Sequence, residues 1–223
     1  SSSAASDVYK RQAIGDALGY PIEFERNINE RQVSKYIFDK GIISDDTQMT
    51  LFTANALLWR ETRAVLKGIA PPFKEAIYLA YLDWLETQTG KKNEKTISWI
   101  KEVPELKEKK APGNTCLSAL SSGKMGTFEE PINHSKGCGT VMRIAPIGLS
   151  IEDPLTAGKI AREASAITHG HQLGMIPSDF KAIFINILTN EDLPLEESLE
   201  KTLKLYAENS SIYSEEFSDY FLQ

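Results

Sequence analysis

Apolar residues recur at steps of three and four along most of the chain, which is the spacing that places side chains on one side of an α-helix. The clearest case runs from Phe73 to Leu85, where an aromatic or aliphatic residue returns at every turn. Strict alternation of apolar and polar residues is absent, and only residues 35–43 allow a short extended segment. The pattern predicts an all-α fold with helices over 46–59, 73–88, 155–168, 178–188 and 195–206.

Prolines and capping residues support these limits. Pro154, Pro177 and Pro194 stand near the starts of the last three predicted helices, where proline is well tolerated. The first twelve residues, SSSAASDVYKRQ, are small and polar without an apolar period, so we expect a non-native or disordered tail over residues 1–12. Residues 13–223 are expected to form one compact helical bundle, since this length suits a single domain.

Composition narrows the class of protein. With 25 Lys and Arg against 31 Asp and Glu the net charge is −6, so no overall basic field attracts nucleic acid. No apolar run approaches the roughly 20 residues that span a bilayer, and the start lacks a secretory pattern. Cys116 and Cys138 are too few for a disulfide scaffold. We therefore expect a soluble, cytoplasmic protein with no membrane and no bulk nucleic-acid partner.

The strongest chemical signal is the sequence Ser-Asp-Asp-Thr at residues 44–47, directly before a predicted helix. Adjacent carboxylates repel one another unless a cation lies between them, and such oxygen ligands suit Mg²⁺, Mn²⁺ or Ca²⁺. A helix cap explains the same residues, because Ser44 or Asp45 can cap and a second acid gains from the helix dipole. Both interpretations stay open on these four residues alone.

A second acidic candidate is Glu23, which follows a segment with two glycines and a proline. Gly15 and Gly19 lie four residues apart on one predicted helix face, where they permit close packing of another backbone. Pro21 should then end this helix. A carboxylate emerging just beyond that break can act as a metal ligand or a base, although a surface acid is the plainer interpretation.

Glycine-bearing turns at 112–114 and 135–139 each lead into an apolar stretch, a geometry able to offer backbone N–H groups to an anion. His169 and His171 follow a helix of small residues and can donate hydrogen bonds or stack, while a buried structural histidine is the commoner case. A nucleophilic Cys138 thiol is not favoured, because no histidine lies near it in sequence.

Taken together, five segments resemble the ADP-ribosylglycohydrolase family, related to the bacterial dinitrogenase-reductase-activating glycohydrolase. GDALGYPIEF is similar to the family's opening motif and SDDTQMTL to its first metal motif. The next three motifs resemble APGNTCLSAL, NHSKGCGTVMRIAPIGL and ITHGH, in the same order. The resemblance covers most of the chain, from residue 14 to residue 171.

The resemblance implies a site as well as a fold. Ser44, Asp45 and Asp46 would be ligands to a pair of Mg²⁺ or Mn²⁺ ions, and Glu23 and Asp46 would be catalytic. The groove for ADP-ribose would be lined by residues from three further motifs, namely Gly113, Asn114, Thr115, Gly137, Cys138, Gly139 and His169. We predict that Glu23, Asp45, Asp46 and His169 approach one cleft.

The implied reaction is hydrolysis of the glycosidic bond that links ADP-ribose to a modified protein side chain or small molecule. The sequence departs from the family in one respect, since no Gly-Gly-Asp-Thr-Asp-type motif follows residue 174. We therefore expect a chain that is incomplete at its carboxyl end and retains half of the metal site. A non-catalytic relative that binds ADP-ribose is the alternative, and another Mg²⁺-dependent phosphohydrolase is disfavoured because no GxxxxGK loop occurs.

Overall fold

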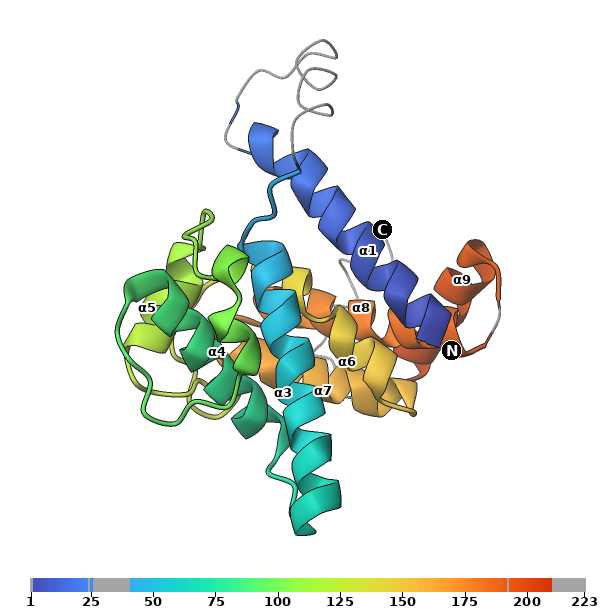
Figure 1. Cartoon of the computed structure of the whole chain (residues 1–223). Coiled ribbons are helices and arrows are strands. Elements are labelled where there is room, and N and C mark those ends of the chain that lie inside the picture. Colours follow the sequence, from blue (N-terminus) through green and yellow to red (C-terminus); the bar gives the residue numbers. More distant parts are fainter. Residues whose placement is uncertain (1, 24, 26–40, 192, 210–223) are drawn as a thin grey trace.

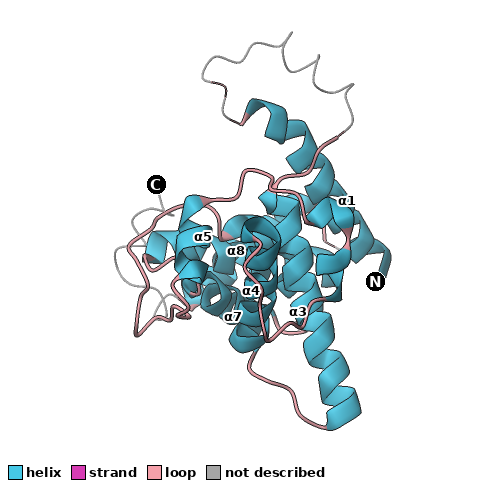
Figure 2. Ribbon diagram, turned by 60° about the vertical axis from the view of Figure 1, so that its left-hand side comes forward, coloured by secondary structure: helices cyan, strands magenta, loops and turns pink. Residues whose placement is uncertain are grey.

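The computed structural model describes residues 2–23, 25, 41–191 and 193–209 of the chain. Within these residues the protein is helical, with eight α-helices and no strand, which confirms the predicted all-α class (Figure 2). The α-helices are α1 (Ser2–Gly19), α3 (Asp45–Lys67), α4 (Phe73–Thr89), α5 (Asn114–Ser121), α6 (Ala145–Ser150), α7 (Pro154–Ala166), α8 (Gln172–Asn190) and α9 (Leu195–Glu208). Four short 3₁₀ turns lie between them, namely η1 (Tyr20–Ile22), η2 (Trp99–Glu102), η3 (Pro104–Leu106) and η4 (Val141–Arg143).

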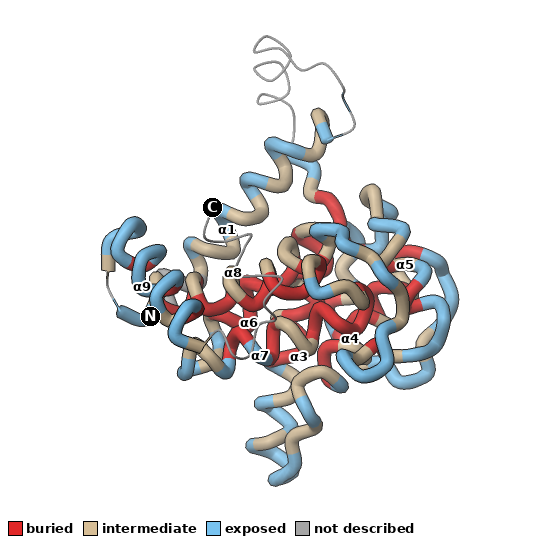
Figure 3. Tube along the Cα trace, turned by 180° about the vertical axis from the view of Figure 1, so that it is seen from behind, coloured by how far each residue is buried: buried red, intermediate tan, exposed pale blue. Residues whose placement is uncertain are grey.

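The body of the molecule is built from helices that pack in pairs. α7 lies along α8 and α3 lies along α4, while α6 contacts both α3 and α8 (Figure 1). The apolar faces predicted for 73–88 and 155–168 meet in the main core, where Tyr81 and Trp84 are fully buried. α9 covers the far side of α8 through a smaller apolar cluster around Ile183 and Tyr206. Buried backbone accordingly concentrates in α3, α4, α6, α7 and α8 (Figure 3).

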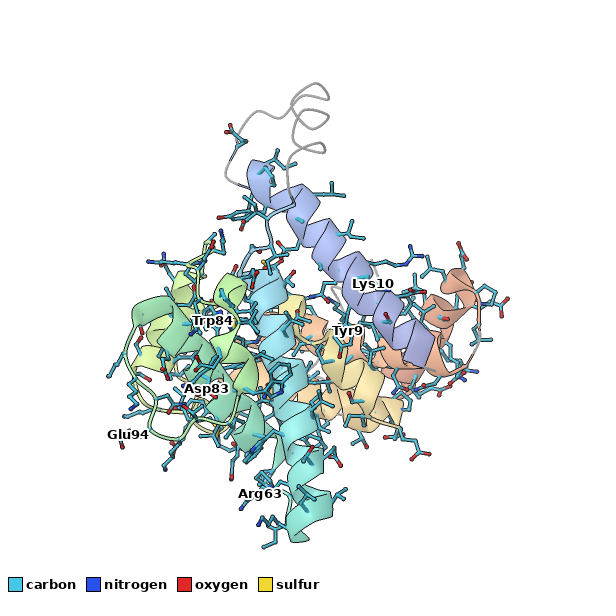
Figure 4. The ribbon with its side chains drawn as sticks, viewed as in Figure 1. Tyr9, Lys10, Arg63, Asp83, Trp84 and Glu94 are labelled. Atoms are coloured by element: carbon cyan, nitrogen blue, oxygen red, sulfur yellow. The ribbon has the colours of Figure 1, made fainter. Side chains whose placement is uncertain are left out.

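Helix α3 is longer than predicted. It continues to Lys67 and ends at Gly68, whose φ of 67° gives the left-handed conformation that closes many helices. The carboxyl-terminal half of α3 extends beyond the body, so that Arg63 lies on a projecting rod (Figure 4). The apolar period ends at Trp59 because the residues beyond it pack against little else.

Two of the expectations on helix limits are wrong. Residues 2–12 are not an irregular tail, since they form the first part of α1, from which Tyr9 projects toward the body (Figure 4). A helix at the edge of the molecule packs against the body through one face only, so a weak apolar period in the sequence is compatible with a helix. Helix α8 begins at Gln172 rather than at residue 178, and Pro177 lies inside it.

The expected extended segment at 35–43 falls mostly outside the described residues, and residues 41–44 have no regular structure. None of the described helices combines the length and the apolar character that crossing a membrane requires.

Candidate functional site

The two adjacent carboxylates lie in the first turn of α3. Ser44 caps this helix, because its Oγ accepts a hydrogen bond from the Asp46 N–H at 3.2 Å. Asp45 is only 5% exposed, and its Oδ2 accepts a hydrogen bond from the Gly113 N–H at 2.9 Å. The start of α3 is thus joined to the loop that leads into α5.

Asp16 of α1 completes the cap and was missed by the sequence analysis. Its Oδ2 accepts hydrogen bonds from the Ser44 N–H at 2.9 Å, the Thr47 N–H at 3.1 Å and the Thr47 hydroxyl at 2.5 Å. The partners are 28 and 31 residues apart in sequence, so no local pattern reveals them. Asp16 thereby holds α1 against the start of α3 and adds a third carboxylate beside Asp45 and Asp46.

These acids repel one another. Burial raises the pKa of Asp45 to about 7; the Gly113 N–H opposes this shift, while Asp46, Glu23 and Asp16 add to it. Burial also raises the pKa of Asp46 to about 6, with Asp16 and Glu23 adding to the shift and Lys181 opposing it. Four carboxylates therefore share one region of negative potential, which a bound cation would relieve.

A cleft of about 400 Å³ opens between the end of α1 and the start of α3. Its lining includes several charged side chains and comes from α1, η1, α3, η4 and α8, namely Gln12, Gly15, Asp16, Gly19, Tyr20, Glu23, Ser44, Asp46, Met142 and Lys181. The expectation that Gly15 and Gly19 permit close packing of a backbone is wrong, because a Cβ at either position would meet no atom within 4 Å. These glycines instead leave the wall of the cleft open.

His169 is buried beside the loop at 137–139 and does not line this cleft. Its Nδ1 is 2.9 Å from the Thr168 hydroxyl, and a Cβ on Gly137 or Gly139 would stand 3.3 Å from the ring. Burial, together with a smaller effect of the Arg143 guanidinium, lowers the pKa of His169 to about 4. The imidazole is therefore neutral near pH 7, and it can exchange hydrogen bonds with a ligand without adding charge.

Arg143 ties Thr168, next to His169, to the core. The guanidinium donates to the Thr168 hydroxyl at 2.7 Å and to the Cys116 Sγ at 3.6 Å, and it stacks 4.4 Å above the Tyr81 ring. Its side chain is fully buried. We interpret Arg143 as a brace that sets the position of His169, since no part of it reaches the cleft.

The structure thus brings together some of the predicted site residues and separates others. Glu23, Ser44 and Asp46 line the cleft, and Asp45 lies behind it against Gly113. Thr115 faces Ser135 with 3.4 Å between the hydroxyl oxygens, which places the loops carrying Asn114 and the exposed Cys138 beside one another. His169 does not line the cleft between α1 and α3.

Ligand geometry for a metal is incomplete. Among the described residues, no three His, Cys, Asp or Glu side chains lie close enough together to hold a metal ion. The carboxylates therefore share an electrostatic field without forming a closed coordination shell. Their oxygen chemistry suits a hard divalent cation, and no described residue donates a hydrogen bond to the Asp46 carboxylate, which leaves its oxygens available.

Comparison with known proteins gives the class of this protein. The model of the family described as ADP-ribosylglycohydrolase matches residues 12–222, nearly the whole chain. The chain therefore belongs to the ADP-ribosylglycohydrolase family. Comparisons with curated proteins and with solved structures gave no match.

The raised pKa values predict how stability depends on pH when no metal is present. A carboxyl whose pKa is higher in the folded chain than its usual 3.8 binds more protons when folded, so the free energy of unfolding falls between about pH 4 and pH 7. Asp45→Asn keeps an oxygen for the Gly113 N–H and removes the charge. We expect this variant to be more stable than the parent by about 1–2 kcal/mol near pH 7 and to differ little near pH 4.

Thermal unfolding in a chelator at several pH values measures this effect. Glu152→Gln is the matched control, because Glu152 is an exposed acid that does not line the cleft. A lower stability of Asp45→Asn near pH 7 would show that the carboxylate is compensated within the folded chain.

Proposed function

We propose that this protein hydrolyses the glycosidic bond between ADP-ribose and a modified protein side chain or small-molecule acceptor, with the help of Mg²⁺ or Mn²⁺. The observation that carries the proposal is the group of four carboxylates at a cleft of about 400 Å³ in a member of a glycohydrolase family. A cluster of negative charge suits a reaction whose transition state develops positive charge on the ribose ring.

The metal ligands in this proposal are Ser44, Asp45 and Asp46. Their oxygen atoms are of the type that Mg²⁺ and Mn²⁺ prefer, and the mutual repulsion of the carboxylates supports binding of a divalent cation. When bound, the cation would orient ribose hydroxyls and acidify a water molecule. Since the described residues supply only part of a shell, we propose a half-site for a single ion.

Glu23 is the residue we propose for proton transfer. It is exposed in the turn after η1 and lines the cleft with Asp46. Its carboxylate can accept a proton from the attacking water, and its protonated carboxyl can donate one to the leaving group, without disturbing a packed contact. Asp46, whose carboxylate faces the same cleft, would hold that water in place.

The diphosphate of ADP-ribose is assigned to the glycine-bearing loops. Gly113 caps α5, which begins with Asn114 and Thr115, and N–H groups at a helix start attract anions. The Gly113 N–H itself is bound to Asp45, so Asn114 and Thr115 would supply the N–H groups here. In the loop of Gly137, Cys138 and Gly139, the Gly137 N–H is bound to Ser135 Oγ, so Cys138 and Gly139 would add further N–H groups. The neutral His169 beside this loop can donate one hydrogen bond. The close fit of Gly137 and Gly139 against the imidazole supports this assignment, because a side chain there would displace the ring.

A non-catalytic role in ADP-ribose binding is the second candidate. It is favoured by the open metal geometry among the described residues. The two functions are separated by incubating the purified chain with ADP-ribosylated arginine, ADP-ribosylated serine peptide and Mg²⁺ or Mn²⁺. Release of free ADP-ribose supports hydrolysis, whereas calorimetric binding of ADP-ribose without release favours the second candidate. Absence of both results would contradict the two proposals together.

Filling the cleft should block the ligand without harming the fold. Gly15 lies in α1 with open space around it, so Gly15→Leu is expected to keep the unfolding temperature of the parent. The new side chain would occupy the cleft and lower ADP-ribose affinity by about tenfold or more. Gly15→Ala, which adds only one carbon, is the control, and calorimetry measures both affinities. Equal affinities for Gly15→Leu and the parent would place the ligand elsewhere.

We also propose a cytoplasmic location. Both Cys116 and Cys138 are free thiols, which suits a reducing compartment. The net charge of −6 supports the absence of a bulk nucleic-acid partner.

A further inference from the structure

One basic side chain stands among the acids of the cleft. Lys181 of α8 lines the cleft together with Asp16, Glu23 and Asp46, and among the described lining residues it is the only cation. Its ammonium is close enough to Asp46 to lower the pKa of that carboxyl, and Asp46 in turn raises the pKa of Lys181 against the larger effect of burial. The two groups therefore form an electrostatic pair.

The position of the ammonium is set by the fold. Lys181 Nζ donates a hydrogen bond to the Val141 carbonyl at 3.0 Å, at the start of η4. An ammonium has three N–H groups, so this bond leaves two for the side facing the acids. Because α8 also contacts η4 along its backbone, the charge is held at the cleft rather than on a freely moving surface chain.

We propose that Lys181 is a built-in cation of this cleft, which competes with a divalent ion for Asp46 and so keeps metal binding weak. The inference rests on the metal site of the proposed function and adds a residue to which that function gives no part. Lys181 acts here through Asp46, so it is a positioning residue and not a catalytic one.

The physical basis is repulsion between two cations that need the same carboxylate. A unit charge and a divalent ion a few ångströms apart repel strongly at the intermediate dielectric of a partly buried site. Removal of the lysine charge also takes away the cation that competes with the ion for the Asp46 oxygens. We therefore expect removal of the charge to tighten binding of a divalent ion by tenfold or more.

The test measures Mn²⁺ binding to the whole chain by electron paramagnetic resonance and by calorimetry. Lys181→Met removes the charge and keeps the length of the side chain, and we expect its Mn²⁺ affinity to rise by about tenfold or more. Lys181→Arg keeps the charge and should stay within about threefold of the parent. Lys201→Met is the surface control, because Lys201 pairs with Glu191 on the other side of α8 and should leave Mn²⁺ affinity unchanged.

Equal or weaker Mn²⁺ binding by Lys181→Met, with an unfolding temperature like that of the parent, would overturn the inference. A gain in affinity for Lys181→Arg as large as that for Lys181→Met would also overturn it, since the charge would then not be the cause. Lys181→Gln, which can still donate to the Val141 carbonyl, replaces Lys181→Met if the latter fails to fold. If neither the parent nor any variant bound Mn²⁺, the metal site of the proposed function would fail and the inference with it. If the parent and Lys181→Met bound Mn²⁺ with equal affinity, the inference would be overturned while the metal site of the proposed function would stand.

Discussion

Replacement of Asp46 by Asn is expected to lower the release of ADP-ribose by at least about 100-fold and to weaken Mn²⁺ binding in the same variant. Asp46 lines the cleft, and no described residue donates a hydrogen bond to its carboxylate, so its oxygens are available for a cation or a water molecule. Asparagine has nearly the same shape and lacks the charge that attracts both. The fold should be kept, because the Asp46 backbone N–H still binds Ser44 Oγ.

Two control variants show whether the effect of Asp46→Asn is specific to the cleft. Glu152→Gln removes an exposed acid outside the cleft and should change neither release nor Mn²⁺ affinity. Cys138→Ser should keep most of the turnover, because we assign the loop around Cys138 a role through its backbone. Radiolabelled ADP-ribose released in long incubations gives the rates. If Cys138→Ser were inactive and Asp46→Asn active, a thiol nucleophile would replace the carboxylates in the proposed reaction.

Local patterns in the sequence predicted most helices because packing in this fold follows them closely. The aromatic positions of 73–88 are the best case, since Tyr81 and Trp84 are fully buried in the core. The cap at Ser44 was also readable, because it joins residues two positions apart. The Ser-Asp-Asp sequence accordingly begins a helix, as expected.

Interactions between residues far apart in the chain could not be predicted from local sequence patterns. Asp16 binds the start of α3 from 28 residues away, and Lys181 reaches the cleft from α8. Lys181 looks like an ordinary charged position on its helix. Asp16 stands in the segment GDALGYPIEF, but its spacing does not show that it binds the start of α3. Gly15 and Gly19 show the converse error, since glycines spaced for close packing line an opening instead.

Helix α8 shows why a single residue type can mislead. Pro177 predicts a helix start, but the helix begins five residues before it at Gln172, after His171. The His171 Nδ1 accepts a hydrogen bond from the Leu173 N–H at 3.1 Å and thereby caps the helix. This capping contact gives His171 a structural role, while its neighbour His169 faces the glycine loop at 137–139.

Gly170 lies between these two histidines. Of the described glycines, it is the one where an added methyl group should reduce the free energy of unfolding the most. A Cβ there would stand 1.9 Å from the Asn133 carbonyl oxygen and 2.9 Å from the Pro131 Cβ. Asn133 cannot yield easily, because its side chain accepts from the Gly170 N–H at 3.1 Å and donates to the Thr168 carbonyl at 2.8 Å. We expect Gly170→Ala to reduce the free energy of unfolding by about 2–4 kcal/mol.

The same substitution should disturb the site that we propose for the diphosphate, because the displaced segment carries His169 on one side and Ser135 on the other. We expect the affinity for ADP-ribose to fall by about tenfold even below the unfolding temperature. Gly15→Ala is the matched control: it adds the same methyl group in open space on a helix and should raise stability by about 0.5–1 kcal/mol. Chemical denaturation and calorimetry measure the two quantities. If Gly170→Ala were as stable as Gly15→Ala, the segment around Asn133 would have to be loose enough to move, and the fixed position we assign to His169 would be wrong.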